Sequence, residues 1–388
     1  MRPLSVVQVI SSPWWTGAAE PALFLTADLA ARGHRVRFIC GPGEALEAQA
    51  QRLGFPREER LDPTRRLDPF RIGRFVRELA GFLEEVRADV LHAHLSADHW
   101  LSLLARRRCR RPVRLIRSLH HPRAAQGNPL ARYLLGRATD AVIAPNSHIA
   151  RLLRERAGVA PERVHLVPGG VDPERFAPPP AGMREKGRAI LGQGAGTPLV
   201  GIVSRLASDR GHMVLFDAFR LLASERPGAR LVVVGKGEYL PRLEKRVRAL
   251  GLEDRVDFPG YHEEDLPEVL AALDLFVLLA PGSEGSCRAV LEAMAMGLPC
   301  VVTGRDGLAD AVEEGVTARV VPEGDALRLA AALRELLGDE GLRRAFGRAG
   351  RRRVEAHFTR GRRAERVEDI YARLLEPSLE AACAGGRA

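Results

Sequence analysis

The chain alternates short apolar segments with amphipathic ones, and it does so twice, over residues 4–169 and again over 198–322. The apolar segments predict strands at 4–10, 35–40, 89–94, 113–120, 140–146 and 163–169, and at 198–204, 229–235, 255–260, 274–280, 299–303 and 318–322. Strands that alternate with helices pair in parallel. Strands that are apolar almost throughout are typical of sheets covered by helices on both faces. The pattern therefore predicts two doubly wound α/β domains.

The run FAPPPAGMREKGRAILGQGAG (176–196) interrupts the alternation and is rich in proline and glycine, which predicts a connection between domains. A chain of 388 residues also exceeds the usual size of one hydrophobic core. From about residue 325 only helices are predicted, ending in 363–375. From the N-terminus, we expect a first domain over 1–177, a linker over 178–196 and a second domain over 197–357. A final helix and tail are expected over 358–388, with the helix packing back toward the first domain.

Composition places the chain among soluble α/β proteins, with 46% hydrophobic residues and 38 glycines. The longest apolar runs are strand-sized and far too short to span a membrane. The start, MRPLSVVQVISSP, is expected to be a first strand and not a signal peptide. The five cysteines are scattered and odd in number, which predicts neither a disulfide framework nor a zinc site and fits a reducing cytoplasm. They are Cys40, Cys109, Cys287, Cys300 and Cys383.

The net charge of +10 comes almost entirely from arginine, since only three of the 59 basic residues are lysines. The densest basic segments are 106–123 and 65–77, the second on a predicted amphipathic helix. Anionic lipid attracts such clusters, so one hypothesis is that the first domain docks on the inner face of the cytoplasmic membrane. The alternative is that an arginine-rich chain contains such clusters without purpose. Nucleic acid is not an expected partner, because no binding motif or interleaved aromatic residues accompany the charge.

Two pairs of charged residues in the second half stand where a ligand is expected. Arg205 and Arg210 share one strand-to-helix loop at a carboxyl edge, and two guanidinium groups suit a diphosphate. Glu284 is predicted in the loop after strand 274–280, and Glu292 in the helix that follows, roughly 10–12 Å away along the axis. That span suits the two ends of a nucleotide-sugar, with Glu292 accepting hydrogen bonds from ribose. The alternatives are a solvated basic loop and ordinary surface charge.

The first half offers weaker signals. Gly17 stands at the start of the first helix, where free N–H groups bind phosphate, and His120 closes the strand 113–120. A plain helix start and a structural histidine are the alternatives. The sequence contains no Asp-x-Asp, Walker loop, zinc-spaced His/Cys set or Gly-x-Ser-x-Gly elbow, so no metal or cofactor is expected.

Taken in order, these motifs resemble the retaining GT-B glycosyltransferases of the large bacterial family 4 type, over nearly the whole chain. The matching segments are TGAAE with ARGHRV, HLVPGGVDPERF, SRLASDRG, ARLVVVGKGE, RVDFPGY and EGSCRAVLEAMAMGLPCV. The resemblance implies two Rossmann-like domains facing a cleft, the second of which binds the nucleotide-sugar and the first the acceptor. It also implies that the two glutamates of the last segment are the paired donor-site acids of the family, Glu-x7-Glu.

By the same resemblance, Arg205 corresponds to the diphosphate arginine, and Arg210 stands where the family usually has lysine. Glu284 corresponds to the acid facing the donor sugar, Glu292 to the acid on the ribose, and His120 to the histidine at the donor sugar.

Departures from the family pattern concern glycines. Gly17 corresponds to the second glycine of a Gly-Gly loop that contacts the donor phosphate, while Thr16 stands at the first. Ser286, Cys287 and Arg288 replace a commoner Phe-Gly-containing run, and their backbone N–H groups are expected to remain available for phosphate or sugar. Asp306-Gly307 replaces a Gly-Gly pair.

The resemblance therefore implies a metal-independent, retaining hexosyl- or related transferase of cell-envelope biogenesis. Its acceptor would be a glycan, a lipopolysaccharide or a lipid-linked saccharide. No nucleophile opposite the anomeric carbon is evident, and the family's retaining chemistry is usually described as same-face attack. The alternatives are a GT-B-type epimerase or phosphorylase, and a basic protein that binds nucleotide without catalysis.

Overall fold

The computed structural model describes residues 2–12, 14–64, 68–125 and 127–376, which divide into two compact units. Unit one comprises 1–168 and 360–388, and unit two comprises 169–359. The expected linker, 178–196, lies inside unit two, because the helix α7 (Met183–Ile190) forms there and packs against α10 (Leu266–Ala272). Cys383 and residues 65–67 of the second basic segment lie outside the described residues.

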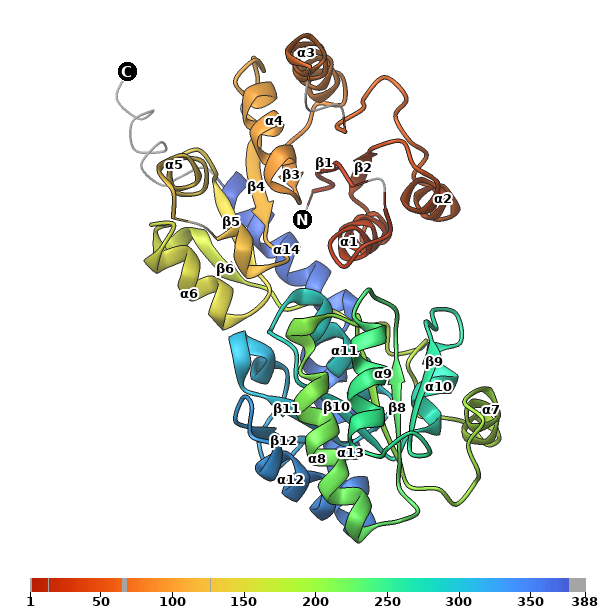
Figure 1. Cartoon of the computed structure of the whole chain (residues 1–388). Helices are drawn as coiled ribbons and strands as arrows, with labels where there is room; N and C mark the ends of the chain where they lie inside the picture. Colours follow the sequence, from red (N-terminus) through yellow and green to blue (C-terminus); the bar gives the residue numbers. More distant parts are fainter. Residues whose placement is uncertain (1, 13, 65–67, 126, 377–388) are drawn as a thin grey trace. The chain divides into compact units, whose positions relative to one another are not determined.

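Unit one is built on a six-stranded parallel sheet in the order β2-β1-β3-β4-β5-β6 (Figure 1). Its strands are β1 (Ser5–Ile10), β2 (Arg35–Cys40), β3 (Val90–Ala93), β4 (Arg114–Ser118), β5 (Ala141–Ala144) and β6 (Val164–Leu166). Its helices are α1 (Ala19–Ala31), α2 (Glu44–Arg52), α3 (Pro69–Glu85), α4 (Ser96–Arg106), α5 (Pro129–Gly136), α6 (Ser147–Glu155) and α14 (Arg360–Leu375).

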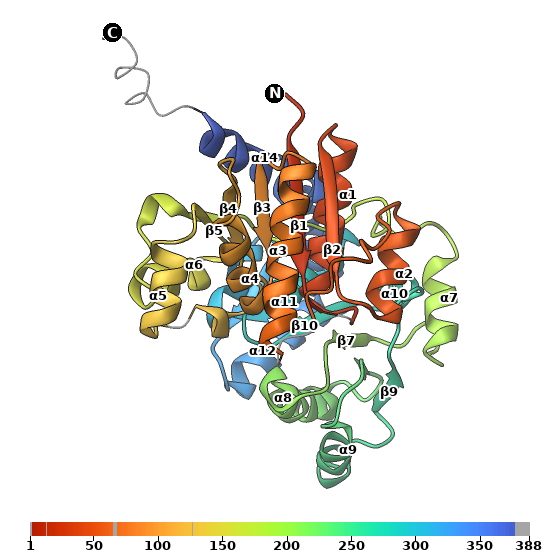
Figure 2. The same cartoon turned by 90° about the horizontal axis from the view of Figure 1, so that it is seen from above.

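Helices cover both faces of this sheet, as the apolar strands predict. All six residues of β1 are buried. On one face α3 packs against α4, and on the other α1 packs against α14 (Figure 2). The second pair brings Tyr371 of the last helix into a core with Leu25 and Leu29 of the first.

Unit two repeats the architecture, with six parallel strands in the order β12-β11-β10-β7-β8-β9. The strands are β7 (Leu199–Val203), β8 (Arg230–Val234), β9 (Val256–Gly260), β10 (Leu275–Leu278), β11 (Cys300–Thr303) and β12 (Ala318–Val321). The remaining helices are α8 (His212–Glu225), α9 (Leu240–Ala249), α11 (Glu284–Ala295), α12 (Ala326–Gly338) and α13 (Glu340–His357). Both predicted sheets are thus confirmed, as is the two-domain α/β class.

Candidate functional site

The sheet of unit two changes direction between β7 and β10. The chain leaves β7 through α8 toward β8 and β9, and it leaves β10 through α11 toward β11 and β12. In doubly wound sheets ligands bind at such a point, outside the carboxyl ends of the strands. The loop after β7 carries Arg205 and Arg210, and the segment after β10 carries Glu284 and Glu292. The topology therefore places both predicted pairs at the same edge.

Arg210 joins these two segments. Its Nη1 donates a hydrogen bond to Oγ of Ser286 (3.0 Å), and its Nε lies 3.2 Å from Oδ1 of Asp209. Burial lowers the pKa of the Arg210 guanidinium, and the Asp209 carboxylate opposes that shift. An arginine stays protonated at neutral pH nonetheless. A fixed positive charge therefore lies at the first turn of α11, while Arg205, on the same loop, is exposed to solvent.

The two glutamates are buried, with exposed fractions of 4% for Glu284 and 9% for Glu292. The alternative of surface charge is therefore wrong for both. Glu284 is the first residue of α11 and does not belong to the preceding loop as expected, because the helix begins directly after its cap, Ser283. Oε1 of Glu292 lies 3.4 Å from Nε of Arg288, one turn earlier. Carboxylates are rarely buried without a partner or a ligand to hold.

The cap of α11 corrects one expectation about its backbone. The N–H of Ser286 donates to Oγ of Ser283 (3.2 Å), and the N–H of Cys287 donates to the Ser283 carbonyl (2.9 Å). These two groups are therefore engaged and not available, contrary to the sequence-based expectation. In the described part of the chain no acceptor faces the N–H of Gly285, and a Cβ there would meet nothing within 4 Å. Sequence reasoning passed over Gly285, although a glycine in a first helical turn, where it weakens the helix, is a usable signal.

Two glycine-containing loops enclose the start of α11. A Cβ added to Gly169, the first residue of unit two, would lie 3.4 Å from Cγ of Glu284, so the chain at this glycine approaches the glutamate. A Cβ added to Gly282 would lie only 2.0 Å from the carbonyl oxygen of Asp306. Asp306 and Gly307 both have positive φ (52° and 81°), a conformation that aspartate tolerates better than most residues. The Asp-Gly pair can thus make the same turn as the Gly-Gly pair it replaces.

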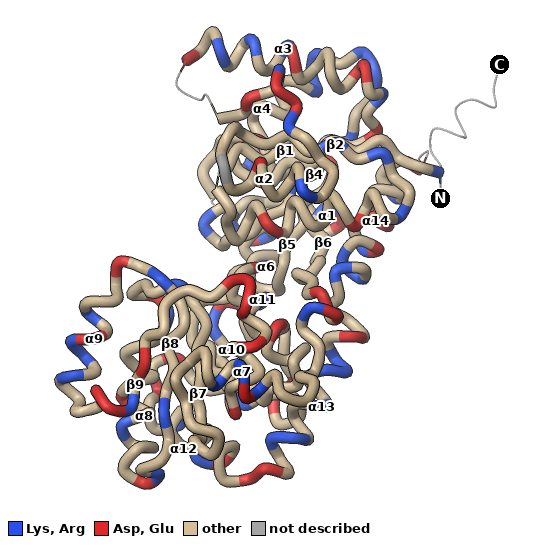
Figure 3. Tube along the Cα trace, turned by 90° about the vertical axis from the view of Figure 1, so that its right-hand side faces the viewer, with Lys and Arg blue, Asp and Glu red and all other residues tan. Residues whose placement is uncertain are grey.

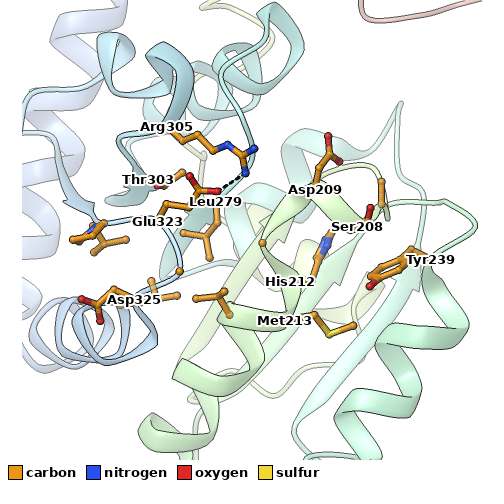
Figure 4. Close-up of a pocket in the computed structure, with 17 residues that line it drawn as sticks. Ser208, Asp209, His212, Met213, Tyr239, Leu279, Thr303, Arg305, Glu323 and Asp325 are labelled. Atoms are coloured by element: carbon orange, nitrogen blue, oxygen red, sulfur yellow. Dashed lines mark hydrogen bonds and ion pairs between the residues drawn. The ribbon is translucent and has the colours of Figure 1, made fainter.

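A cavity of about 210 Å³ lies beside this cluster, between the start of α8 and the loop after β12 (Figure 4). Ser208, Asp209 and His212 line it on one side, and the ion pair between Arg305 and Glu323 (2.5 Å) borders the other. Its lining does not include the two glutamates, Arg205 or Arg210. The predicted site residues therefore form a cluster of their own, adjacent to the cavity.

In unit one, Gly17 occupies an exposed turn just before α1. Oγ1 of Thr16 accepts a hydrogen bond from the N–H of Ala19 (3.2 Å), so the threonine at the first glycine position caps the helix. A Cβ at Gly17 would meet nothing within 4 Å. The space beside Gly17 is therefore open, and its phosphate contact stays a prediction.

His120 lies two residues beyond β4 and is buried, with Nε2 3.2 Å from Nδ1 of His94. Nε2 of His94 is in turn 2.7 Å from Oε1 of Gln8. Burial lowers the pKa of His94 well below its usual value, so this imidazole is neutral. With the Gln8 carbonyl facing it, His94 carries its proton on Nε2 and offers Nδ1 to the N–H of His120. The chain Gln8–His94–His120 thus fixes which nitrogen of His120 is protonated, and sequence reasoning missed its first two members.

Two family profiles together match most of the chain. The profile described as "Glycosyl transferases group 1" matches residues 183–353, and the one described as "Glycosyltransferase Family 4" matches 15–175. The D-inositol 3-phosphate glycosyltransferase of Nocardia farcinica is 30% identical over 372 residues, which cover 89% of this chain and 77% of that enzyme. The chain belongs to the family-4 type of GT-B glycosyltransferases.

The mannosylfructose-phosphate synthase of Agrobacterium fabrum is 33% identical over 259 residues, 64% of this chain, but the match spans only 56% of that enzyme. Among solved structures, Anabaena HepE in complex with UDP-glucose superposes with a TM-score of 0.81 at 22% identity, over 95% of this chain and 100% of HepE. The structural likeness supports the GT-B fold of this glycosyltransferase.

Among the described residues of this glycosyltransferase, no three His, Cys, Asp or Glu side chains gather to hold a metal ion. No helix in the same ranges is both long and apolar enough to cross a bilayer.

Proposed function

We propose that this glycosyltransferase moves a sugar from a nucleotide-sugar donor to an acceptor with retention of anomeric configuration and without a metal ion. The observation that carries the proposal is the cluster at the carboxyl edge of unit two, where Glu284 and Glu292 are buried and Arg210 reaches the first turn of their helix. The UDP-glucose bound by HepE, which shares the fold, supports a nucleotide-sugar as the donor.

In the proposed mechanism each charged group acts on one part of the donor. Arg205 and Arg210 stabilise the diphosphate as its negative charge grows during bond cleavage, which is electrostatic catalysis by preorganised groups. Glu292 accepts hydrogen bonds from the ribose hydroxyls. The N–H of Gly285, in the first turn of α11, donates to the phosphate or the sugar. Glu284 and His120 orient the sugar. The contact of its Nε2 with His94 holds the ring of His120 in a fixed orientation for this purpose.

The proposed acceptor is a glycan or lipid-linked saccharide of the cell envelope, and α3 suggests how the enzyme could reach it. Phe70, at the start of α3, is 90% exposed, and Arg71, Arg74 and Arg77 are exposed along the same helix. Figure 3 shows both basic and acidic positions along the trace of α3. An apolar side chain beside arginines is typical of helices that lie on anionic membranes. Carboxylates offset part of this charge, since Glu78 pairs with Arg74 at 2.7 Å.

The other basic segment, 106–123, adds less exposed positive charge for membrane binding than its sequence suggests. Four arginines of this segment are exposed, namely Arg107, Arg108, Arg110 and Arg111, but the residues of β4 that follow are mostly buried, and Arg117 is among them.

Liposome co-sedimentation tests the membrane proposal: binding should require anionic lipid, weaken as salt rises and weaken in Phe70→Ser. Leu327→Ser is the matched control, because Leu327 is 73% exposed in unit two. Equal binding by neutral and anionic vesicles would refute this electrostatic docking.

A nucleotide-sugar screen by thermal shift tests the proposed activity, since a ligand that binds only the folded state raises the melting temperature. The donor found in this way is then incubated with and without acceptor, with and without EDTA, and the anomeric configuration of the product is read by NMR. Transfer with retention that survives EDTA supports the proposal. An epimerised sugar or a sugar phosphate formed without acceptor would instead show the epimerase or phosphorylase alternative.

A further inference from the structure

A second cavity, of about 260 Å³, lies wholly within unit one. It is enclosed by the first turns of α4, the end of β4, the short 3-10 turn Pro122–Ala124 and the helix α5. Among the described residues, its polar lining consists of Ser96, His99, Arg117, Arg123 and Asn128, with no acidic side chain. A water molecule takes up about 30 Å³ of liquid, so the space admits a phosphate with part of the sugar that carries it.

Arg117 is the unusual member of this lining. Only 3% of the residue is exposed, and its Nη1 donates to two carbonyl oxygens, of Ser118 (2.8 Å) and Ala93 (3.4 Å). Within the described ranges no carboxylate pairs with it, and its Nε and Nη2 donate to no protein group. The buried carboxylate that influences it, Asp98, accepts instead from the backbone N–H groups of Ser11 and Leu95.

Arg188 in unit two shows what a structural arginine looks like at the same degree of burial. It too is 3% exposed, but its Nη2 lies 3.1 Å from Oδ2 of Asp274, and it also donates to the carbonyls of Gly194 and Thr197. A buried charge is costly unless it is paired and hydrogen-bonded. Burial lowers the pKa of Arg117 only to about 10, so its charge is present at neutral pH. The cavity is where its missing counter-ion would fit.

We propose that this cavity binds a phosphate group of the acceptor, held by the buried guanidinium of Arg117 and by Arg123 at the rim. Paired guanidinium groups present forked donors that match phosphate oxygens. Arg117 precedes His120 by three residues, which is roughly 10 Å of extended chain. The cavity is thus lined by the end of the same strand, β4, that leads to the histidine assigned to the donor sugar. The word "acceptor" rests on the proposed function, whereas the anion site stands on this cavity alone.

Isothermal titration with inorganic phosphate tests the site directly. Arg117→Gln and Arg123→Gln should each weaken phosphate binding at least about tenfold, because hydrogen bonds from a charged donor are the strong ones. Arg111→Gln, which removes an exposed charge outside the cavity, should leave binding unchanged. Arg205→Ala removes only what the proposed donor site contributes and should retain the phosphate binding that is lost in the two cavity variants, which separates this site from the donor site. Arg123 is exposed, so its variant keeps the experiment decisive if Arg117→Gln does not fold.

Glucose 6-phosphate and vesicles of phosphatidylglycerol, each titrated against the same variants, distinguish a soluble phosphoester from a lipid phosphate. If Arg117→Gln and Arg123→Gln lose binding to one of these two probes more than to the other, the result supports the site and shows whether its phosphate belongs to a soluble phosphoester or to a lipid. Phosphate binding that disappears in Arg205→Ala but persists in both cavity variants would overturn the proposal. It would also be overturned if the wild-type protein bound none of the three probes. A failure of sugar transfer with intact phosphate binding would count against the proposed function alone.

Discussion

Three buried histidines make unit one sensitive to acid. Burial lowers the pKa values of His92, His94 and His99 well below the usual value for histidine. The unfolded chain, with histidine pKa values near 6.5, therefore binds more protons than the folded one below that pH, and stability falls as the pH falls. Between about pH 7.5 and 5.5 each group contributes a loss of about 1.4 kcal/mol, so the three together remove about 4 kcal/mol.

This loss is large beside the 5–15 kcal/mol that typically holds a protein folded. One buried carboxyl acts the other way: burial raises the pKa of Asp98, so it takes up its proton at a higher pH in the folded chain than in the unfolded one. That offset begins as the pH falls through the raised pKa of the folded chain. Three histidines act against this one carboxyl, so the stability of unit one still falls as the pH falls.

Tryptophan fluorescence during urea unfolding measures the effect selectively. All three tryptophans, Trp14, Trp15 and Trp100, belong to unit one. The free energy of unfolding that they report should drop over the two pH units by about 4 kcal/mol less the opposing contribution of Asp98. His99→Gln should reduce that drop by about 1.4 kcal/mol, whereas His357→Gln, at an exposed position of α13, should leave it unchanged. A drop of the same size in wild type and His99→Gln would refute the reasoning.

The site residues give three further predictions. Glu292→Gln should weaken nucleotide binding roughly ten- to a hundredfold by calorimetry, since hydrogen bonds to a charged group are lost; unchanged affinity in a folded variant would contradict the ribose contact. Arg205→Ala should lower kcat more than it lowers affinity for the nucleoside, because the diphosphate charge grows in the transition state. Arg210→Lys should have a milder effect on kcat because the positive charge stays. Wild-type turnover in Arg205→Ala would exclude the assigned role. His94→Phe should shift the ¹⁵N resonances of His120 and lower kcat with little change in KM; unshifted resonances would show that His94 does not set the tautomer.

The sheets were predictable because the relevant signal is local. A run such as LSVVQVI is apolar at nearly every position and is bounded by polar loops, which is how a strand covered on both faces looks in any context. The placement of Arg205, Arg210 and Glu292 follows from that pattern, since loops after parallel strands share one edge. Glu284 was predicted in the loop before α11 but is the first residue of that helix. The start of the helix is set by the cap residue Ser283, and a single contact of this kind is difficult to predict from sequence.

The histidine chain was not predictable in the same way, because it depends on the order of strands in the sheet. Gln8 on β1, His94 after β3 and His120 after β4 meet because β3 lies between β1 and β4. The partners are separated by 86 and 26 positions in the sequence, and an apolar run does not reveal which strand it will pair with. Polar residues inside apolar strands, such as Gln8, are the one sign that a buried network exists.

Arg117 shows that the net charge of a segment does not tell which of its arginines are exposed, whereas the alternation of side chains along a strand does. By charge alone, 106–123 is one basic surface, for which an anionic membrane is the expected partner. Successive side chains of a strand point to opposite faces, so Arg114 and Arg117, three residues apart, lie on different faces of β4. The first is exposed and pairs with Asp140, and the second is buried without a carboxylate among the described residues. The alternation of side chains along β4 thus distinguishes the solvated Arg114 from Arg117, which is placed to hold an anion. The net charge of +10 does not distinguish them, because each contributes one positive charge.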